Sequence, residues 1–124
     1  MKGEVFLIHW NASQAERYAT ELRADGWNVE VEAEDGGRAY QSTRANPPDV
    51  VVVQLSDKPS HGREVAHTLR QAEATRHLPV VFVDGKEEDL EKARAKVPDG
   101  VFTTSTELPK VLTRSSKSPD IMSS

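Results

Sequence analysis

Short apolar runs, each about four residues long, are the feature that most restricts what this chain can fold into. They are Val5–Ile8, Val50–Val53, Val80–Val83 and the weaker run Val101–Thr104. A continuous apolar run of this length is typical of a β-strand that is covered on both faces. Between Trp27 and Glu32, by contrast, valines alternate with polar residues, which predicts a half-exposed edge strand.

The segments between these runs have the spacing of amphipathic helices. Apolar residues recur at intervals of three and four in the stretches 15–22, 39–43, 65–72, 90–97 and 108–112. Buried strands that alternate with helices need crossover connections, and they therefore form a parallel sheet with helices on both faces. Five such units in 124 residues predict an α/β fold, a flavodoxin-like (βα)5 doubly wound parallel sheet with strand order 2-1-3-4-5. The binding crevice of such a sheet lies at the carboxyl ends of the first and third strands.

The distribution of these segments predicts one domain and a tail. Residues 1–112 contain all of the periodic segments, and we expect them to form a single domain. Residues 113–124 are rich in serine, and we expect them to be a disordered C-terminal tail.

Charge and composition restrict the classes of partner. The chain has 16 Lys and Arg against 20 Asp and Glu, and this mildly acidic balance without a basic stripe argues against nucleic acid. No apolar run approaches the roughly 20 residues that span a bilayer, and the N-terminus lacks the anatomy of a signal peptide. The chain has no cysteine, which excludes disulfides and thiolate chemistry. We therefore expect a cytoplasmic protein whose partner is neither nucleic acid nor a membrane.

Four short motifs follow one another around the predicted strands. They are Gly26–Val29, Ala33–Gly36, Pro48–Gln54 with Gly62 eight residues later, and Leu78–Val81. With these motifs the chain resembles, from Glu4 to Leu112, the CheY-like receiver domain of bacterial response regulators. The resemblance implies the same sheet order, a receiver-like domain over residues 1–112, and a role in two-component signal transduction.

The resemblance fails at the positions that carry the chemistry of receivers. Receivers end the first strand with two acidic residues that hold Mg²⁺, and they end the third strand with an aspartate that accepts the phosphoryl group. A hydroxyl residue ends their fourth strand and a lysine ends their fifth. The matching positions are, in the same order, His9, Trp10, Gln54, Asp84 and Thr104. Lys58 also stands in place of the loop proline, and Pro59 follows it.

These substitutions remove each part of phosphoryl transfer. The amide of Gln54 cannot form an acyl phosphate, because its nitrogen lone pair is delocalised. His9 and Trp10 lack the negative oxygen ligands that hold Mg²⁺, and Thr104 lacks the positive charge that neutralises a phosphoryl group. The sequence therefore predicts a stand-alone degenerate pseudo-receiver that is not an enzyme, uses no cofactor or metal, and acts independently of phosphorylation.

A pseudo-receiver must act through contact with another signalling protein. In receivers, the fourth helix, fifth strand and fifth helix form the usual surface for a partner or a second copy. The resemblance therefore implies candidate contacts at Glu87, Glu91, Arg94, Thr103 and Leu108. We expect a monomer or a weak homodimer; the sequence names neither the partner nor its pathway, and it does not say whether Gln54 fixes an active-like or an inactive-like surface.

A second hypothesis is a flavodoxin-like protein that binds a small molecule or a metal in the same crevice. Its pocket would be lined by His9, Asn11, Gln54, Asp57, His61 and Asp84. The spacing of these residues matches no compact metal motif, and ordinary loop polarity also explains them. Trp10 is open to two interpretations, since it could fill the vacated ion pocket or serve as an exposed anchor for a partner.

Overall fold

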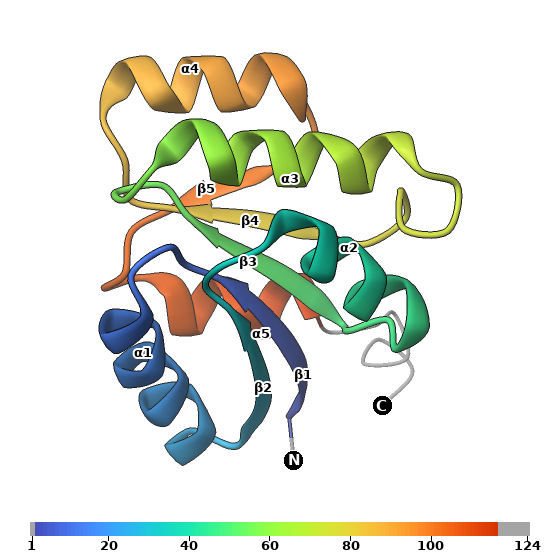
Figure 1. Cartoon of the computed structure of the whole chain (residues 1–124). Coiled ribbons are helices and arrows are strands. Elements are labelled where there is room, and N and C mark those ends of the chain that lie inside the picture. The colour runs from blue at the N-terminus through green and yellow to red at the C-terminus, as the bar shows by residue number, and fades with distance from the viewer. Residues whose placement is uncertain (1, 117–124) are drawn as a thin grey trace.

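The computed structural model describes residues 2–116 and consists of one parallel sheet between two layers of helices (Figure 1). The strands are β1 (Gly3–Ile8), β2 (Trp27–Glu32), β3 (Val50–Gln54), β4 (Val80–Val83) and β5 (Val101–Thr103). The helices are α1 (Ala12–Ala24), α2 (Gly36–Ala45), α3 (Pro59–Gln71), α4 (Glu87–Lys96) and α5 (Leu108–Ser116). The strand order is β2-β1-β3-β4-β5 with every pair parallel, which confirms the predicted fold class.

β3 is the centre of the sheet, and all five of its residues are buried. It pairs with β1 on one side, where Val50 lies opposite Val5, and with β4 on the other, where Val51 lies opposite Val80. Because no face of β3 meets water, its run of valines needs apolar cover on both sides.

Two hydrophobic clusters supply that cover, one on each face of the sheet. α2, α3 and α4 pack over one face, with Ala39, Leu69 and Ala93 buried against the sheet. α1 and α5 pack over the other face, where Leu22 and Leu112 are buried. Figure 1 shows this division, with α3 and α4 on one side of the sheet and α5 on the other.

The first two helices begin at side-chain caps. Asn11 precedes α1 and its side chain accepts from the backbone N–H of Gln14 at 3.1 Å. Asp35 precedes α2 and accepts from the backbone N–H of Gly37 at 2.7 Å. Such caps satisfy donors that have no partner within the helix, so they fix where each helix starts.

α5 continues beyond the predicted boundary at residue 112. Residues 113–116 belong to the helix, so the expected tail is wrong over these four residues, and residues 117–124 lie outside the described part of the chain. The Thr113 hydroxyl donates to the Pro109 carbonyl at 3.1 Å, and Arg114 lies in the last turn, where a positive charge suits the helix dipole. Serine content alone therefore misplaced the end of the helix.

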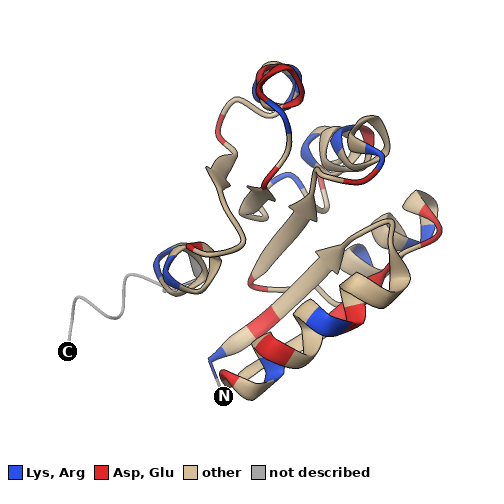
Figure 2. Cartoon of the chain, turned by 90° about the vertical axis from the view of Figure 1, so that its left-hand side faces the viewer, with Lys and Arg blue, Asp and Glu red and all other residues tan. Residues whose placement is uncertain are grey.

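Charges of both signs are interspersed on the helices (Figure 2). On α1, for example, Glu16 and Glu21 alternate with Arg17 and Arg23. Within residues 2–116, no helix combines the length and the apolar composition that crossing a bilayer requires.

Replacing Phe82 with alanine tests the packing of the sheet. The Phe82 side chain is fully buried, and its ring stacks on that of Phe102 with a centroid distance of 4.9 Å. Phe82→Ala should lower the free energy of unfolding by about 3–5 kcal/mol, because it removes apolar contacts and leaves a cavity. Urea unfolding measures this change. The control Val101→Ala alters a side chain that is 41% exposed, and it should shift the free energy by less than about 1 kcal/mol. A Phe82→Ala change as small as that of the control would contradict the described core.

Candidate functional site

Four of the residues singled out by the sequence lie at one edge of the sheet. His9 directly follows β1, Gln54 is the last residue of β3, Asp84 follows β4, and Thr104 follows β5. Parallel strands end at the same edge, so these side chains share one neighbourhood although they are far apart in the sequence. Their burial and their hydrogen-bond partners differ from one residue to the next.

Gln54 and Asp84 are joined directly. Gln54 is 1% exposed, and its Nε2 donates to Asp84 Oδ2 at 3.3 Å. Its Oε1 accepts from the backbone N–H of Ser56 at 2.9 Å. The second carboxylate oxygen of Asp84, Oδ1, accepts from the backbone N–H of Ser105 at 3.1 Å. We name the chain of contacts from Gln54 through Asp84 to Ser105 the Asp84 bridge.

The backbone of the Asp84 bridge has an uncommon conformation. Asp84 has φ = 59° and the next residue, Gly85, has φ = 99°. Residues with a Cβ rarely adopt the left-handed region, although aspartate tolerates it better than most. The backbone N–H of Asp84 also donates to the Thr103 carbonyl at 2.9 Å, which ties the turn to β5.

His9 does not line the crevice as expected, because its side chain is fully buried. Nδ1 accepts from the backbone N–H of Asn11 at 3.3 Å, and the ring lies 5.6 Å from that of Tyr18 on α1. Burial lowers the pKa of His9 below its ordinary value, and the nearby carboxylates of Asp57 and Asp84 oppose this shift in part. His9 therefore packs under α1 as a neutral imidazole.

Trp10 is half-buried and packs against the cluster on the α3 side of the sheet. Its ring meets that of His61 edge-on at 5.9 Å, beside a hollow of about 300 Å³ that Gly36 and Val65 also line. The indole N–H is buried and has no hydrogen-bond partner in the described structure. Trp10 therefore packs against the core on the α3 side, and it is not a fully exposed anchor.

Thr104 takes part in the turn that leads into α5. Its side chain is exposed, and its Oγ1 accepts from the backbone N–H of Glu107 at 3.3 Å. The hydroxyl thus caps the turn and carries no charge toward Gln54. Ser105, which sequence reasoning passed over, contributes only its backbone N–H to the bridge, and no sequence motif signals such a role.

The residues expected to line a ligand pocket are largely committed to other contacts. Gln54 and Asp84 bond to each other, His9 is buried, and the Asn11 side chain caps α1. This leaves Asp57 and the exposed His61. Among residues 2–116, no three His, Cys, Asp or Glu side chains are placed to hold an ion together.

The expected partner surface is only partly exposed. Glu87, Glu91 and Arg94 are exposed on α4, and Thr103 is half-buried on β5. Leu108 is only 5% exposed and belongs to the core cluster under α1 and α5, so its prediction as a contact residue is wrong. The helical stripe of Leu108, Val111 and Leu112 already pointed to this buried role.

β5 contributes two apolar residues that the sequence did not single out. The guanidinium carbon of Arg94 lies 4.6 Å from the centre of the Phe102 ring, on the α4 side of the sheet. Val101 is 41% exposed, and because neighbouring side chains of a strand point to opposite faces, it lies on the other side of the sheet from Phe102. The sequence gives little indication that Val101 and Phe102 are accessible, because the run Val101–Thr104 has the pattern of an ordinary buried strand.

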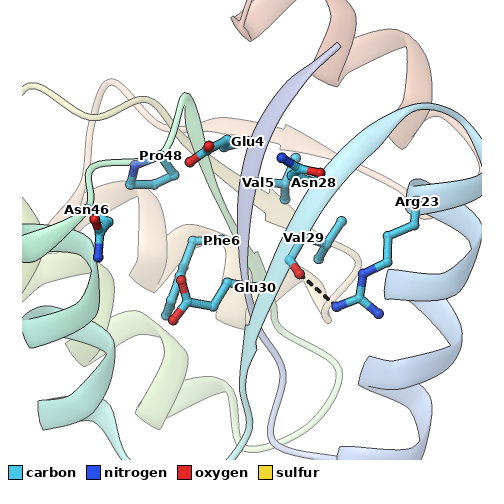
Figure 3. A pocket seen from close by; sticks show the side chains of 9 residues that line it. All are labelled: Glu4, Val5, Phe6, Arg23, Asn28, Val29, Glu30, Asn46 and Pro48. Carbon is cyan, nitrogen blue, oxygen red and sulfur yellow. Dashed lines mark hydrogen bonds between the residues drawn. The ribbon is translucent and has the colours of Figure 1, made fainter. Parts of the chain in front are cut away.

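A separate hollow of about 290 Å³ lies toward the opposite end of β1 (Figure 3). Glu4 and Glu30 face it with Asn46 and Pro48, while Arg23 at its rim donates to the Val29 carbonyl at 2.7 Å. Its lining contains none of the residues at the Asp84 bridge.

Comparison with known proteins agrees with this architecture. No family model matches the chain. A putative response regulator from Chloroflexus aurantiacus superposes with a TM-score of 0.79 and 18% identity, covering 92% of this chain and 97% of that one. The receiver domain of the sensor histidine kinase PA1611 from Pseudomonas aeruginosa, which has a magnesium ion in its active-site cleft, superposes with a TM-score of 0.76 and 21% identity, covering 94% and 98%.

One curated protein has a related sequence over part of the chain. The probable transcriptional regulatory protein TcrX of Mycobacterium tuberculosis is 36% identical over 73 residues, which are 59% of this chain. The matched part is 30% of the length of that protein. The strand order and the superpositions together show that the chain has the fold of response-regulator receiver domains.

Proposed function

We propose that this chain is a receiver-like module of two-component signalling that acts in the cytoplasm by binding another signalling protein, without being phosphorylated. The fold and its structural neighbours support the signalling context. The observation that carries the rest of the proposal is Gln54, whose buried amide occupies the acceptor position of the resemblance and is committed to two hydrogen bonds.

The chemistry of Gln54 argues against an acyl phosphate. A carboxylate attacks phosphorus through an oxygen lone pair, whereas an amide nitrogen is a poor nucleophile and its product would be unstable. Asp84 is a poor replacement as acceptor, because each of its carboxylate oxygens already accepts a hydrogen bond, from Gln54 and from Ser105, which lowers its nucleophilicity. The bridge lies at the positions that the resemblance assigns to the acceptor aspartate and to the hydroxyl residue after the fourth strand.

The ion site is equally altered. Mg²⁺ needs oxygen ligands, with at least one or two carboxylates, in near-octahedral geometry. The matching positions supply a buried neutral imidazole at His9 and an indole at Trp10 that packs against the core. Neither side chain offers an oxygen.

The docking surface in this proposal is the exposed side of α4 and β5. Glu87, Glu91 and Arg94 provide charge of both signs, and Arg94 covers the ring of Phe102. Aromatic and arginine side chains of this kind contribute strongly to binding when a partner excludes water from them.

Incubation with acetyl phosphate and Mg²⁺ tests the proposal directly. The intact mass of the chain should stay unchanged, because Gln54 offers no carboxylate at the acceptor position and no three His, Cys, Asp or Glu side chains of residues 2–116 are grouped to hold an ion. A receiver domain that has an acceptor aspartate serves as the positive control in the same buffer. A stoichiometric gain of one phosphoryl group, mapped to an aspartate, would refute the proposal.

The neutral state of His9 predicts a dependence of stability on pH. The unfolded chain takes up a proton at His9 near pH 6.5, whereas the folded chain does so only at lower pH. Below about pH 6.5 the unfolded state therefore binds more protons than the folded state. As the pH is lowered through this range, the free energy of unfolding falls by up to about 1.4 kcal/mol per pH unit.

Urea unfolding between about pH 7.5 and pH 5.5 measures this effect. Wild type should lose more stability over that range than His9→Asn, which has no proton to gain at this position. The exposed His77 provides the control, since His77→Gln should follow the wild-type curve. Parallel curves for wild type and His9→Asn would show that burial does not hold His9 neutral.

A double substitution on α4 tests the docking surface. In affinity purification, the variant Glu91→Ala/Arg94→Ala should recover at least about tenfold less of a partner protein that wild type retains. Glu16→Ala/Arg17→Ala removes the same charges from α1 on the other face and should keep that protein. Equal recovery by both double variants would place the contact elsewhere.

A further inference from the structure

The Asp84 bridge adds side-chain contacts between three segments at the ends of β3, β4 and β5, where the backbone ladder of the sheet finishes. Gln54 ends β3, Asp84 opens the loop between β4 and α4, and Ser105 lies in the loop between β5 and α5. We propose that Asp84 is a permanent latch that holds both loops against β3 in one arrangement. This inference rests on the proposed function, and it specifies how that function is regulated: the partner surface is presented in a single state.

The first step is the conformation of the loop itself. Two consecutive residues, Asp84 and Gly85, have positive φ, which a free loop populates poorly at a residue with a Cβ. Such backbone persists only where surrounding contacts over-determine it. Here those contacts are the two bonds of the Asp84 carboxylate and the bond from its own N–H to Thr103.

The second step is transmission to α4. A Cβ placed on Gly85 would lie 2.9 Å from the Leu55 Cβ and 3.5 Å from the Leu90 Cδ2. The backbone at Gly85 is therefore packed between the residue after β3 and the first turns of α4. Gly85 and Leu90 are both partly buried, and their proximity couples the conformation at Gly85 to the position of Leu90.

The third step reaches the exposed surface. Leu90 and Phe102 both pack against the same core cluster, and Phe102 carries Arg94 over its ring. On the other side, Ser105 is three residues before the buried Leu108, which starts α5. The Asp84 side chain thus fixes both the start of α4 and the loop that leads into α5.

The substitution Gln54→Glu tests the latch with almost no change in shape. One oxygen of the introduced carboxylate can still accept from Ser56, while the other faces the Asp84 carboxylate and, at a pH where both groups are ionised, can no longer donate. Hydrogen exchange followed by NMR should then show the Ser105 amide exchanging about tenfold faster than in wild type. The Ser105 amide bonds to Asp84 rather than to Gln54, so a purely local role for Gln54 would leave its rate unchanged.

A reciprocal exchange provides the sharper test. In Asp84→Asn, an amide faces the Gln54 amide, and one donor must lose its partner whichever way either group is turned. In the double variant Gln54→Glu/Asp84→Asn, the amide introduced at position 84 can donate to the carboxylate introduced at position 54, while its oxygen accepts from Ser105. We expect each single variant to accelerate Ser105 exchange about tenfold and the double variant to recover at least about a third of the lost protection.

The matched control is Asp57→Asn. It makes the same change from carboxylate to amide in the same crevice, at a residue outside the bridge, and Ser105 should exchange at the wild-type rate. Unchanged Ser105 exchange in both single variants, or a double variant no better protected than the singles, would overturn the latch. These outcomes are separate from those of the acetyl phosphate experiment: phosphorylation of wild type would refute the proposed function and leave the exchange result standing.

Discussion

Burial of β3 on both faces is the constraint on which the rest of this structure depends. The valines from Val50 to Val53 have no contact with water, so helices must cover the sheet on each side. Parallel strands joined by covering helices all end at the same edge. That is why Gln54, which ends the most buried strand, lies beside the loops that follow β4 and β5.

At that edge the chain has hydrogen bonds where a phosphorylated receiver would have ions. Gln54 is buried and polar, and it is tolerated because both ends of its amide have partners. Asp84 retains a negative charge, but two donors occupy its oxygens. The left-handed conformation of Asp84 costs roughly 1–2 kcal/mol, a penalty that these bonds can offset. We propose that the crevice acts through its shape and that the exposed, charged side of α4 binds the partner.

Much of the fold could be predicted from the sequence, because apolar periodicity reports burial directly. The parallel sheet follows from alternating strands and helices, five units in this length fit the order 2-1-3-4-5, and the residues at the strand ends follow from that order. The end of α5 could not be predicted from composition, since the Thr113 contact with Pro109 and the last-turn position of Arg114 extend the helix past its apolar stripe.

The details of the site were harder to predict from the sequence than the fold. The sequence predicted that Gln54 and Asp84 would lie at the same crevice, but not that they would bond to each other, nor the left-handed backbone of Asp84 or its bond to Ser105, because these depend on how two distant loops pack. His9 was expected in an open crevice, whereas the covering of α1 buries it. Leu108 was assigned to a surface by resemblance alone, and its own helical stripe was the better guide.

The central claim is that this crevice responds to neither a divalent cation nor a phosphoryl group. A ¹⁵N NMR titration with Mg²⁺, followed by beryllium fluoride as a phosphoryl mimic, tests it most directly. The account predicts that the amide signals of Ser56, Gly85 and Ser105 keep their positions throughout. Saturable shifts concentrated on those three amides would contradict it.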